Sequence, residues 1–337
     1  MDLIIEGPGT FVSKHQGRLR VSRDKAVMSE APLINLQQVL LVGGGVAISS
    51  DAVRACTEEG IPIHYLSSSG SAIAGLYAAG LTGTAATRRA QLLAYTDQRG
   101  LSLARSFVCG KLRNQASGLR YMAKYRREAY PDLYRELELV ALEIQDSMAD
   151  AEDLKGTHVE EVREILMGIE GNAAARYWQV IGCIVPAALE WPGRATRGAT
   201  DPLNSALNYG YGVLYAQVER ALVLAGLDPY AGYLHADRPG KPSLVLDLIE
   251  EFRQPVVDRV VLGLVNRGMV VERDAEGRLT EPVRRRLAEK VLERLAAAEL
   301  YEGQRRALRH ILQAQARHIA TYVRGDRPAY EPFAAGW

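Results

Sequence analysis

The organisation of the chain changes near residue 85, and this change limits the folds that it can form. Before that point, short apolar runs alternate with Gly, Pro and Ser, a pattern typical of strands joined by turns. After it, glycines become rarer and apolar residues recur at the 3.6-residue spacing of amphipathic helices. The sequence therefore predicts an α+β protein, with a small N-terminal β-rich domain followed by a large all-α C-terminal domain.

The same patterns give the expected boundaries. The predicted division is a β-rich domain at 1–82, a linker at 83–88, an α-helical domain at 89–323 and a loosely held tail at 324–337. Strands are expected at Leu3–Ile5, Arg18–Val21, Gln38–Val42 and Ile61–Leu66, with a short helix at Ser50–Cys56. Longer helices are expected at Gln91–Phe107, Lys111–Lys124, Pro131–Met148, Val159–Ile184, Pro202–Ala225, Ser243–Asn266 and, with a break, Glu281–Val323.

Composition narrows the class of protein. A chain of 337 residues with 47% hydrophobic residues can bury a substantial core. Its 41 basic and 40 acidic residues nearly balance, so a nucleic-acid partner has to be inferred from local clusters. Cys56, Cys109 and Cys183 form no CxxC pair, which argues against a cysteine zinc site. Without a signal-peptide pattern or an apolar run of about 18 residues, we expect a cytoplasmic protein with no membrane partner.

Three consecutive glycines, Gly43–Gly45, follow a predicted strand and suggest a phosphate-binding loop. The run lacks the GxGxxG spacing, and no βαβ unit of the required length surrounds it. We therefore interpret it as a tight turn.

Glu170 is a carboxylate in an otherwise apolar helical stretch. At roughly 100° per residue it falls in the same stripe as Leu166 and Tyr177. Neighbouring glycines and alanines leave room beside it for a backbone or a ligand. An apolar helix retains a charge only when the charge is paired or ligates something. One possibility is a buried ion pair with Arg176, and the other is a metal ligand.

A later apolar helix carries one narrow acidic strip. Glu250, Glu251 and Asp258 fall within roughly 60° of Asp247 on it. Asp247 and Glu250 are three residues apart, so they are predicted to share a cation, and a divalent ion neutralises such a pair best. Asp258 is expected to be structural. Arg253 lies among apolar positions and either pairs with an acid or reaches toward an anion.

His235 precedes this acidic helix, separated by a loop that lets the imidazole reach the start of the helix. A histidine with carboxylates and no thiolate suits Mg²⁺ or Mn²⁺ better than structural zinc. Such an ion keeps positions open for phosphate oxygens and an attacking hydroxyl, which is the arrangement of phosphodiester chemistry.

A cluster of cations is interleaved with Tyr121 and Tyr125, which is typical of a DNA-binding surface. The alternative is a solvated helix face. The residues predicted to contact DNA are Arg88, Arg89, Lys111, Arg113, Arg120, Lys124, Arg126, Arg127 and Arg176.

Three blocks together resemble a known family. They are Met167–Trp178, Asp201–Asn204 with Tyr209–Tyr211, and His235 with Ser243–Arg253. In order and spacing they resemble the CRISPR-associated spacer-acquisition integrase, the universal adaptation nuclease of CRISPR systems. The resemblance implies that Glu170, His235 and Glu250 are metal ligands, that Asp247 is a supporting acid, and that Arg253 is the basic residue after it. The chain departs from the family at Asn172, where many members have a basic residue, and at Gln254, which is inserted before Pro255.

The resemblance also implies an activity. Family members use Mg²⁺ or Mn²⁺ to insert short foreign DNA fragments into a CRISPR array, the 3′-hydroxyl ends attacking phosphodiesters at the repeat borders. They act as homodimers on double-stranded DNA with a small ferredoxin-like partner, and the β-rich domain lies on the dimerisation side.

Other functions remain open from the sequence alone. A metal-dependent nuclease of branched DNA would use the same ligands without joining ends. A catalytically idle DNA-binding scaffold subunit would not need three ligands. A hydrolase of small phosphorylated molecules would not need the basic cluster.

Overall fold

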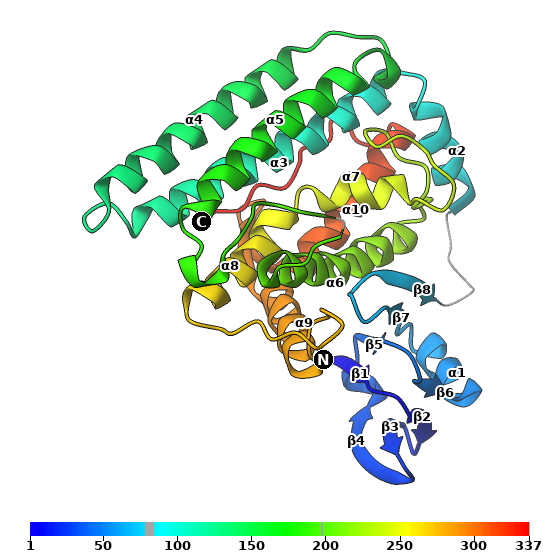
Figure 1. Cartoon of the computed structure of the whole chain (residues 1–337). Helices are drawn as coiled ribbons and strands as arrows, with labels where there is room; N and C mark the ends of the chain where they lie inside the picture. Colours follow the sequence, from blue (N-terminus) through cyan, green and yellow to red (C-terminus); the bar gives the residue numbers. More distant parts are fainter. Residues whose placement is uncertain (78–83, 197, 337) are drawn as a thin grey trace. The chain divides into compact units, whose positions relative to one another are not determined.

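The computed structural model describes residues 1–77, 84–196 and 198–336 (Figure 1). It separates into two compact units. The strand-rich unit comprises Met1–Leu81, Thr196–Ala216 and Val270–Leu292. The helical unit comprises Thr82–Ala195, Gln217–Met269 and Glu293–Trp337. The α+β class, with strands first and helices after, is confirmed. Residues 196–216 and 270–292 belong to the strand-rich unit. This division differs from the prediction, which placed all of 89–323 in one helical domain.

Two four-stranded sheets form the strand-rich unit. The first has the order β1 (Asp2–Glu6), β5 (Gln38–Val42), β7 (Ile63–Leu66), β8 (Ala72–Leu76), and its first three strands are parallel. The second has the order β4 (Ala26–Pro32), β3 (Arg18–Arg23), β2 (Thr10–His15), β6 (Ala47–Ile48). All four strands expected from the sequence are present. β4 was missed because its first five residues are exposed, so it lacks the apolar alternation that marks a half-buried strand.

A short helix and a glycine turn complete this core. α1 (Ser50–Glu58) corresponds to the helix expected at Ser50–Cys56 and is capped by Ser49, whose hydroxyl accepts the Ala52 N–H at 3.2 Å. Ala52, Ala55 and Cys56 of α1 pack into the core shared by both sheets. The glycine run is a tight turn, as predicted: Gly45 has φ +77°, and a Cβ there would lie 2.9 Å from Pro8 Cα.

Two later helices contribute residues to the strand-rich unit. These are α6 (Pro202–Leu224) and α9 (Glu281–Ala296). In α6, Gly212 approaches the Gly70 loop so closely that a Cβ would lie 1.6 Å from the Gly70 oxygen. In α9, Arg284 donates from Nε to Glu6 of β1 at 2.5 Å. Burial raises the pKa of Glu6 above its usual value, against the lowering effect of Arg284.

Replacing Gly212 with alanine tests this close approach. G212A forces the helix and the loop apart, so we expect a loss of about 1–3 kcal/mol and a lower midpoint of thermal unfolding. G168A is the matched control, because no described atom lies within 4 Å of a Cβ placed there. Equal midpoints for the two variants would contradict the observed contact.

The helical unit is a layered set of helices. α2 (Thr84–Ala94), α3 (Gln98–Lys124), α4 (Pro131–Asp153) and α5 (Arg163–Gly182) come first, and α3 packs against the other three (Figure 1). The remaining elements are α7 (Ser243–Ile249), a π-helical segment (Arg253–Asp258), α8 (Arg259–Asn266), the hairpin β9 (Ala298–Tyr301) and β10 (Gln304–Ala307), and α10 (Leu308–Arg324). Short 3₁₀ turns occupy Val159–Glu161 and Ala187–Leu189 in this unit and Leu33–Asn35 in the strand-rich unit. Within the described ranges, no helix is both long and apolar enough to cross a membrane.

Several predicted boundaries change in this unit. Residue 83 of the expected linker lies outside the described residues, and residues 84–88 were wrongly assigned to it, because they belong to α2. The helix expected at Gln91–Phe107 is interrupted where Asp97 accepts the Arg99 N–H at 2.8 Å and caps α3. The break expected within Glu281–Val323 is the β9–β10 hairpin.

The C-terminal tail is packed, so the prediction of a loosely held segment was wrong. Tyr330 and Phe333 are buried, and the Phe333 ring stacks on Phe252 at 5.2 Å between centroids. The Tyr330 hydroxyl and the Phe333 N–H donate to the Glu251 carboxylate at 2.5 and 2.8 Å. Asn114 of α3 donates to the Phe333 carbonyl at 2.8 Å and accepts the Ala335 N–H at 2.9 Å. Buried polar partners therefore hold the backbone of the tail.

Truncating the buried aromatic side chain should release the tail. We expect F333A to cost about 3–5 kcal/mol and to expose residues 326–336 to limited proteolysis. E331A is the control on the same segment, because the Glu331 side chain is exposed. Wild-type protease resistance in F333A would show that the tail is not held by this packing.

Candidate active site

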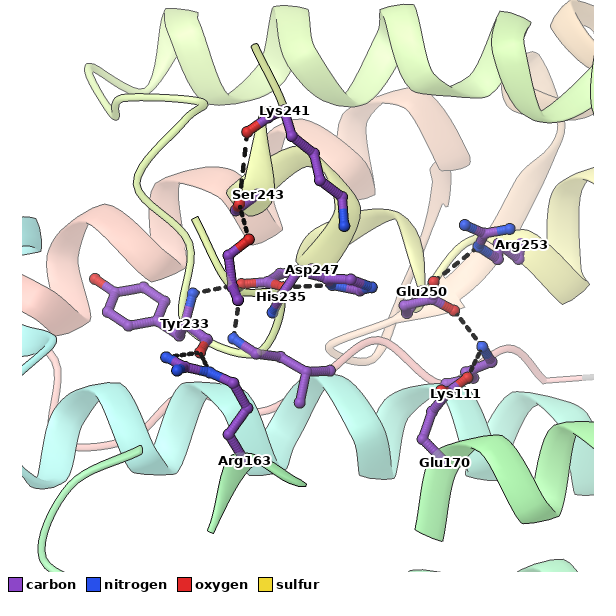
Figure 2. Close-up of polar contacts among 12 residues, drawn as sticks. Lys111, Arg163, Glu170, Tyr233, His235, Lys241, Ser243, Asp247, Glu250 and Arg253 are labelled. Atoms are coloured by element: carbon purple, nitrogen blue, oxygen red, sulfur yellow. Dashed lines mark hydrogen bonds and ion pairs between the residues drawn. The ribbon is translucent and has the colours of Figure 1, made fainter. Parts of the chain in front are cut away.

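Glu170 and Glu250 converge on one cation, the ammonium of Lys111 (Figure 2). Glu170 comes from α5, Glu250 directly follows α7, and Lys111 comes from α3. The Lys111 Nζ lies 2.7 Å from Glu250 Oε2 and also forms an ion pair with Glu170 Oε1. Lys111 is only 8% exposed. Two acids that are far apart in the sequence therefore share one buried cationic position.

Mutual attraction keeps these buried groups charged. Burial alone would lower the pKa of Lys111, but the facing Glu250 and Glu170 carboxylates raise this pKa above its usual value. Burial acts to raise the pKa of Glu250, yet Arg253, whose Nε lies 3.0 Å from Oε1, and Lys111 together lower that pKa to about 2. Glu250 thus faces a cation on each of its oxygens. Arg253 pairs with an acid, the first of the two possibilities considered for it.

Asp247 organises the loop that carries His235. It is fully buried and accepts the backbone N–H groups of Tyr233, Leu234 and His235 at 2.6, 3.1 and 2.9 Å. Its Oδ1 also lies 2.8 Å from His235 Nδ1 (Figure 2). Metal-binding histidines are typically oriented in this way through the ring nitrogen that does not bind the metal.

The donor set suits a hard divalent ion. Two carboxylates directed at one position and one imidazole are ligands that Mg²⁺ and Mn²⁺ accept. His235 lies close enough to Glu250 to lower its pKa electrostatically. Within the part of the chain that the structure describes, however, no three His, Cys, Asp or Glu side chains are grouped closely enough to hold a metal. Only Glu170 and Glu250 therefore approach the same position, and His235 is oriented beside them by Asp247.

A π-helical turn follows Glu250. Arg253–Asp258 is π-helical, which is how a helix accommodates one extra residue. Gln254, the residue inserted relative to the family pattern, lies within this turn. The freed Pro255 carbonyl accepts Arg294 Nε at 2.8 Å, and Asp258 accepts the Tyr177 hydroxyl at 2.9 Å. Asp258 is thus structural, as expected.

The cations predicted to contact DNA do not form one surface. Lys111 is buried in the site, and two others face α4. Arg113 lies 3.8 Å from Glu152, and Arg120 donates to Gln145 Oε1 at 2.7 Å. Lys111 was assigned to the DNA cluster although it follows Cys109 and Gly110 and precedes Leu112. A charge in an apolar stretch, the signal that identified Glu170, was present there too.

The remaining predicted contacts differ in exposure. Arg176 donates to Glu143 at 2.8 Å, so the alternative ion pair between Arg176 and Glu170 was wrong. Arg126 is partly buried and donates to the Met122 carbonyl at 2.8 Å. The exposed members are Arg88, Arg89, Lys124 and Arg127.

No pattern in the sequence predicted the hydrogen-bond network around Tyr233. Its carbonyl accepts from Arg163 at 3.2 Å (Figure 2). Its hydroxyl donates to the Gln91 carbonyl at 3.1 Å. Arg163 also donates to the Tyr95 hydroxyl at 2.7 Å. Gln91 belongs to α2, Arg163 to α5, and Tyr95 to the loop between α2 and α3. Together they hold the backbone of Tyr233, two residues before His235.

Asp247→Asn tests this arrangement. The asparagine amide would direct its own N–H at backbone N–H groups that now donate to the carboxylate. We therefore expect D247N to lower the free energy of unfolding by at least about 2 kcal/mol. The Nδ1 tautomer of His235, followed by NMR, should also change. D237N is the control on the exposed loop. A D247N protein with the unfolding midpoint and His235 signals of D237N would contradict the role given to Asp247.

The fold and the site define an α+β protein in which a carboxylate pair and a histidine held by a buried aspartate lie beside α3. The family model described as CRISPR associated protein Cas1 matches residues 3–298, and the chain belongs to this family. The relatives include CRISPR-associated endonuclease Cas1 1 of Archaeoglobus fulgidus, 37% identical over 100% of both chains. CRISPR-associated endonuclease Cas1 3 of Thermus thermophilus is 37% identical over 96% of this chain and 94% of its own.

Solved structures share the fold. A casposase bound to integration product has a TM-score of 0.82 at 23% identity, covering 98% of this chain and 92% of its own. A Cas1 protein from Thermotoga maritima has a TM-score of 0.77 at 20% identity, covering 99% and 100%. A Cas6-RT-Cas1–Cas2 complex gives 0.78 at 20% identity, covering 99% of this chain and 36% of the other. The family resemblance identified from the sequence is confirmed.

Proposed function

We propose that this protein is a metal-dependent DNA endonuclease and integrase that inserts short DNA fragments into a CRISPR array during spacer acquisition. The observation that carries the proposal is the convergence of Glu170 and Glu250 on one buried cationic position. The relatives named as CRISPR-associated endonucleases and the casposase bound to integration product support it.

The residues of the site would divide the chemistry among them. Glu170, Glu250 and His235 would hold Mg²⁺ or Mn²⁺, which when bound supplies a Lewis acid for the phosphodiester. Asp247 keeps Nδ1 of His235 engaged and so leaves Nε2 for a ligand. Arg253, beside Glu250, places positive charge where negative charge develops.

The proposed reaction is a transesterification. A 3′-hydroxyl oxygen of the incoming fragment attacks phosphorus in the repeat border and forms a new P–O bond. The bond from phosphorus to the 3′ oxygen of the target strand breaks, and that oxygen leaves with a proton as a new 3′-hydroxyl. One phosphodiester is exchanged for another, so no external energy source is needed.

Exposed cations and partner proteins complete the proposal. Arg88, Arg89, Lys124 and Arg127 are exposed and are assigned to the DNA backbone, where each phosphate contact adds salt-sensitive affinity. We also propose a homodimer with a small ferredoxin-like partner. The structural neighbour described as a Cas6-RT-Cas1–Cas2 complex supports a Cas partner.

An integration assay tests the proposed function. Labelled short duplex, a supercoiled plasmid carrying a CRISPR repeat and Mn²⁺ or Mg²⁺ should give label joined to the plasmid. E170A and E250A should each lower joining by at least about 100-fold, because each removes a carboxylate of the converging pair. E164A, an exposed position on the same helix as Glu170, should retain joining.

The other outcomes assign other functions. Metal-dependent cutting without joining would identify a nuclease of branched DNA. DNA binding without chemistry in any metal would identify a scaffold subunit. Equal activity of E170A and wild type would place the chemistry elsewhere.

A further inference from the structure

Lys111 combines a fixed backbone with a flexible side chain. At Gly110, the preceding residue, a Cβ would lie 2.7 Å from Pro332 Cβ, so α3 and the tail are in close contact there. The backbone under Lys111 is therefore held, while its ammonium is carried on a flexible four-carbon side chain. Such a side chain can withdraw from an ion pair without movement of its helix.

The Lys111 ammonium occupies the position that a metal ion bound by both Glu170 and Glu250 would need. Its Nζ lies 2.7 Å from Glu250 Oε2 and is paired with Glu170 Oε1. A divalent ion held by both carboxylates would need oxygens at about 2.0–2.2 Å. A divalent and a monovalent cation about 3 Å apart would repel each other strongly in a buried site. The two cations therefore exclude each other.

The site is more open on the side of Glu170. The Glu170 side chain is 17% exposed, whereas the Glu250 side chain is 5% exposed. The solvent side of the site is therefore at Glu170, and it is the side toward which a displaced ammonium would move.

We infer that Lys111 is a built-in competitor of the divalent ion, occupying the position between Glu170 and Glu250 until the metal displaces its ammonium. This inference rests on the proposed function, from which it takes the ion. Without either cation, two like charges would face each other in a buried site, which is strongly unfavourable. Lys111 thus preserves the arrangement of the site and at the same time limits metal affinity.

Mn²⁺ binding without DNA tests the inference, read by electron paramagnetic resonance and by thermal unfolding. K111M should unfold at a lower temperature than wild type in EDTA and should gain more from added Mn²⁺. It should also bind Mn²⁺ at least about tenfold more tightly, because a competing charge is removed. K124M is the matched control: the same substitution on the same helix, at an exposed position.

K111R keeps the charge and should keep the wild-type affinity for Mn²⁺, which separates charge from packing. If K111M does not fold, K111Q provides the neutral comparison with K111R. Equal or weaker Mn²⁺ binding by K111M or K111Q would overturn the inference, provided that the E170A/E250A double variant loses the ion. If that double variant binds Mn²⁺ as wild type does, the proposed metal site itself is wrong.

Discussion

Two ionised carboxylates that are buried side by side repel each other strongly unless a cation lies between them, and this constraint shapes the helical unit. Glu170 and Glu250 come from different parts of the helical unit, and Lys111 forms an ion pair with each of them. The three groups connect α3, α5 and the end of α7 at one point. Asp247 connects the histidine loop to the same short helix. The reactive groups are therefore held by elements of the core.

Periodicity predicted the helices and selected Glu170 and Glu250, because an ionised group in an apolar stripe is visible in the sequence alone. It did not predict the hydrogen-bond partners of Asp247, since an angle on a helical wheel does not show that the 233–235 backbone folds back onto that carboxylate. It also read Lys111 as one member of a basic cluster. Only the three-dimensional packing of α3 separates this buried cation from its exposed neighbours.

Local composition misled where long-range partners decide the structure. The tail has the Pro and Gly content of a loose segment, yet Asn114 and Glu251 hold its backbone. The break at Tyr95–Asp97 and the π-helical turn both fall in regions with a continuous helical pattern. Asp97 caps α3, and Arg253–Asp258 forms a π-helical turn. Both features change the path of the backbone, but the spacing of apolar residues does not predict either of them.

The order in which the chain is synthesised adds a consequence of the packed tail. At about 5–20 residues per second, α3 and α7 leave the ribosome well before residues 330–335. Until those residues are synthesised, the carboxylate of Glu251, which follows Glu250, lacks its hydrogen bonds from the Tyr330 hydroxyl and the Phe333 N–H. The surroundings of the site are thus completed late, after the helices that carry Lys111, Glu170 and Asp247 have been synthesised.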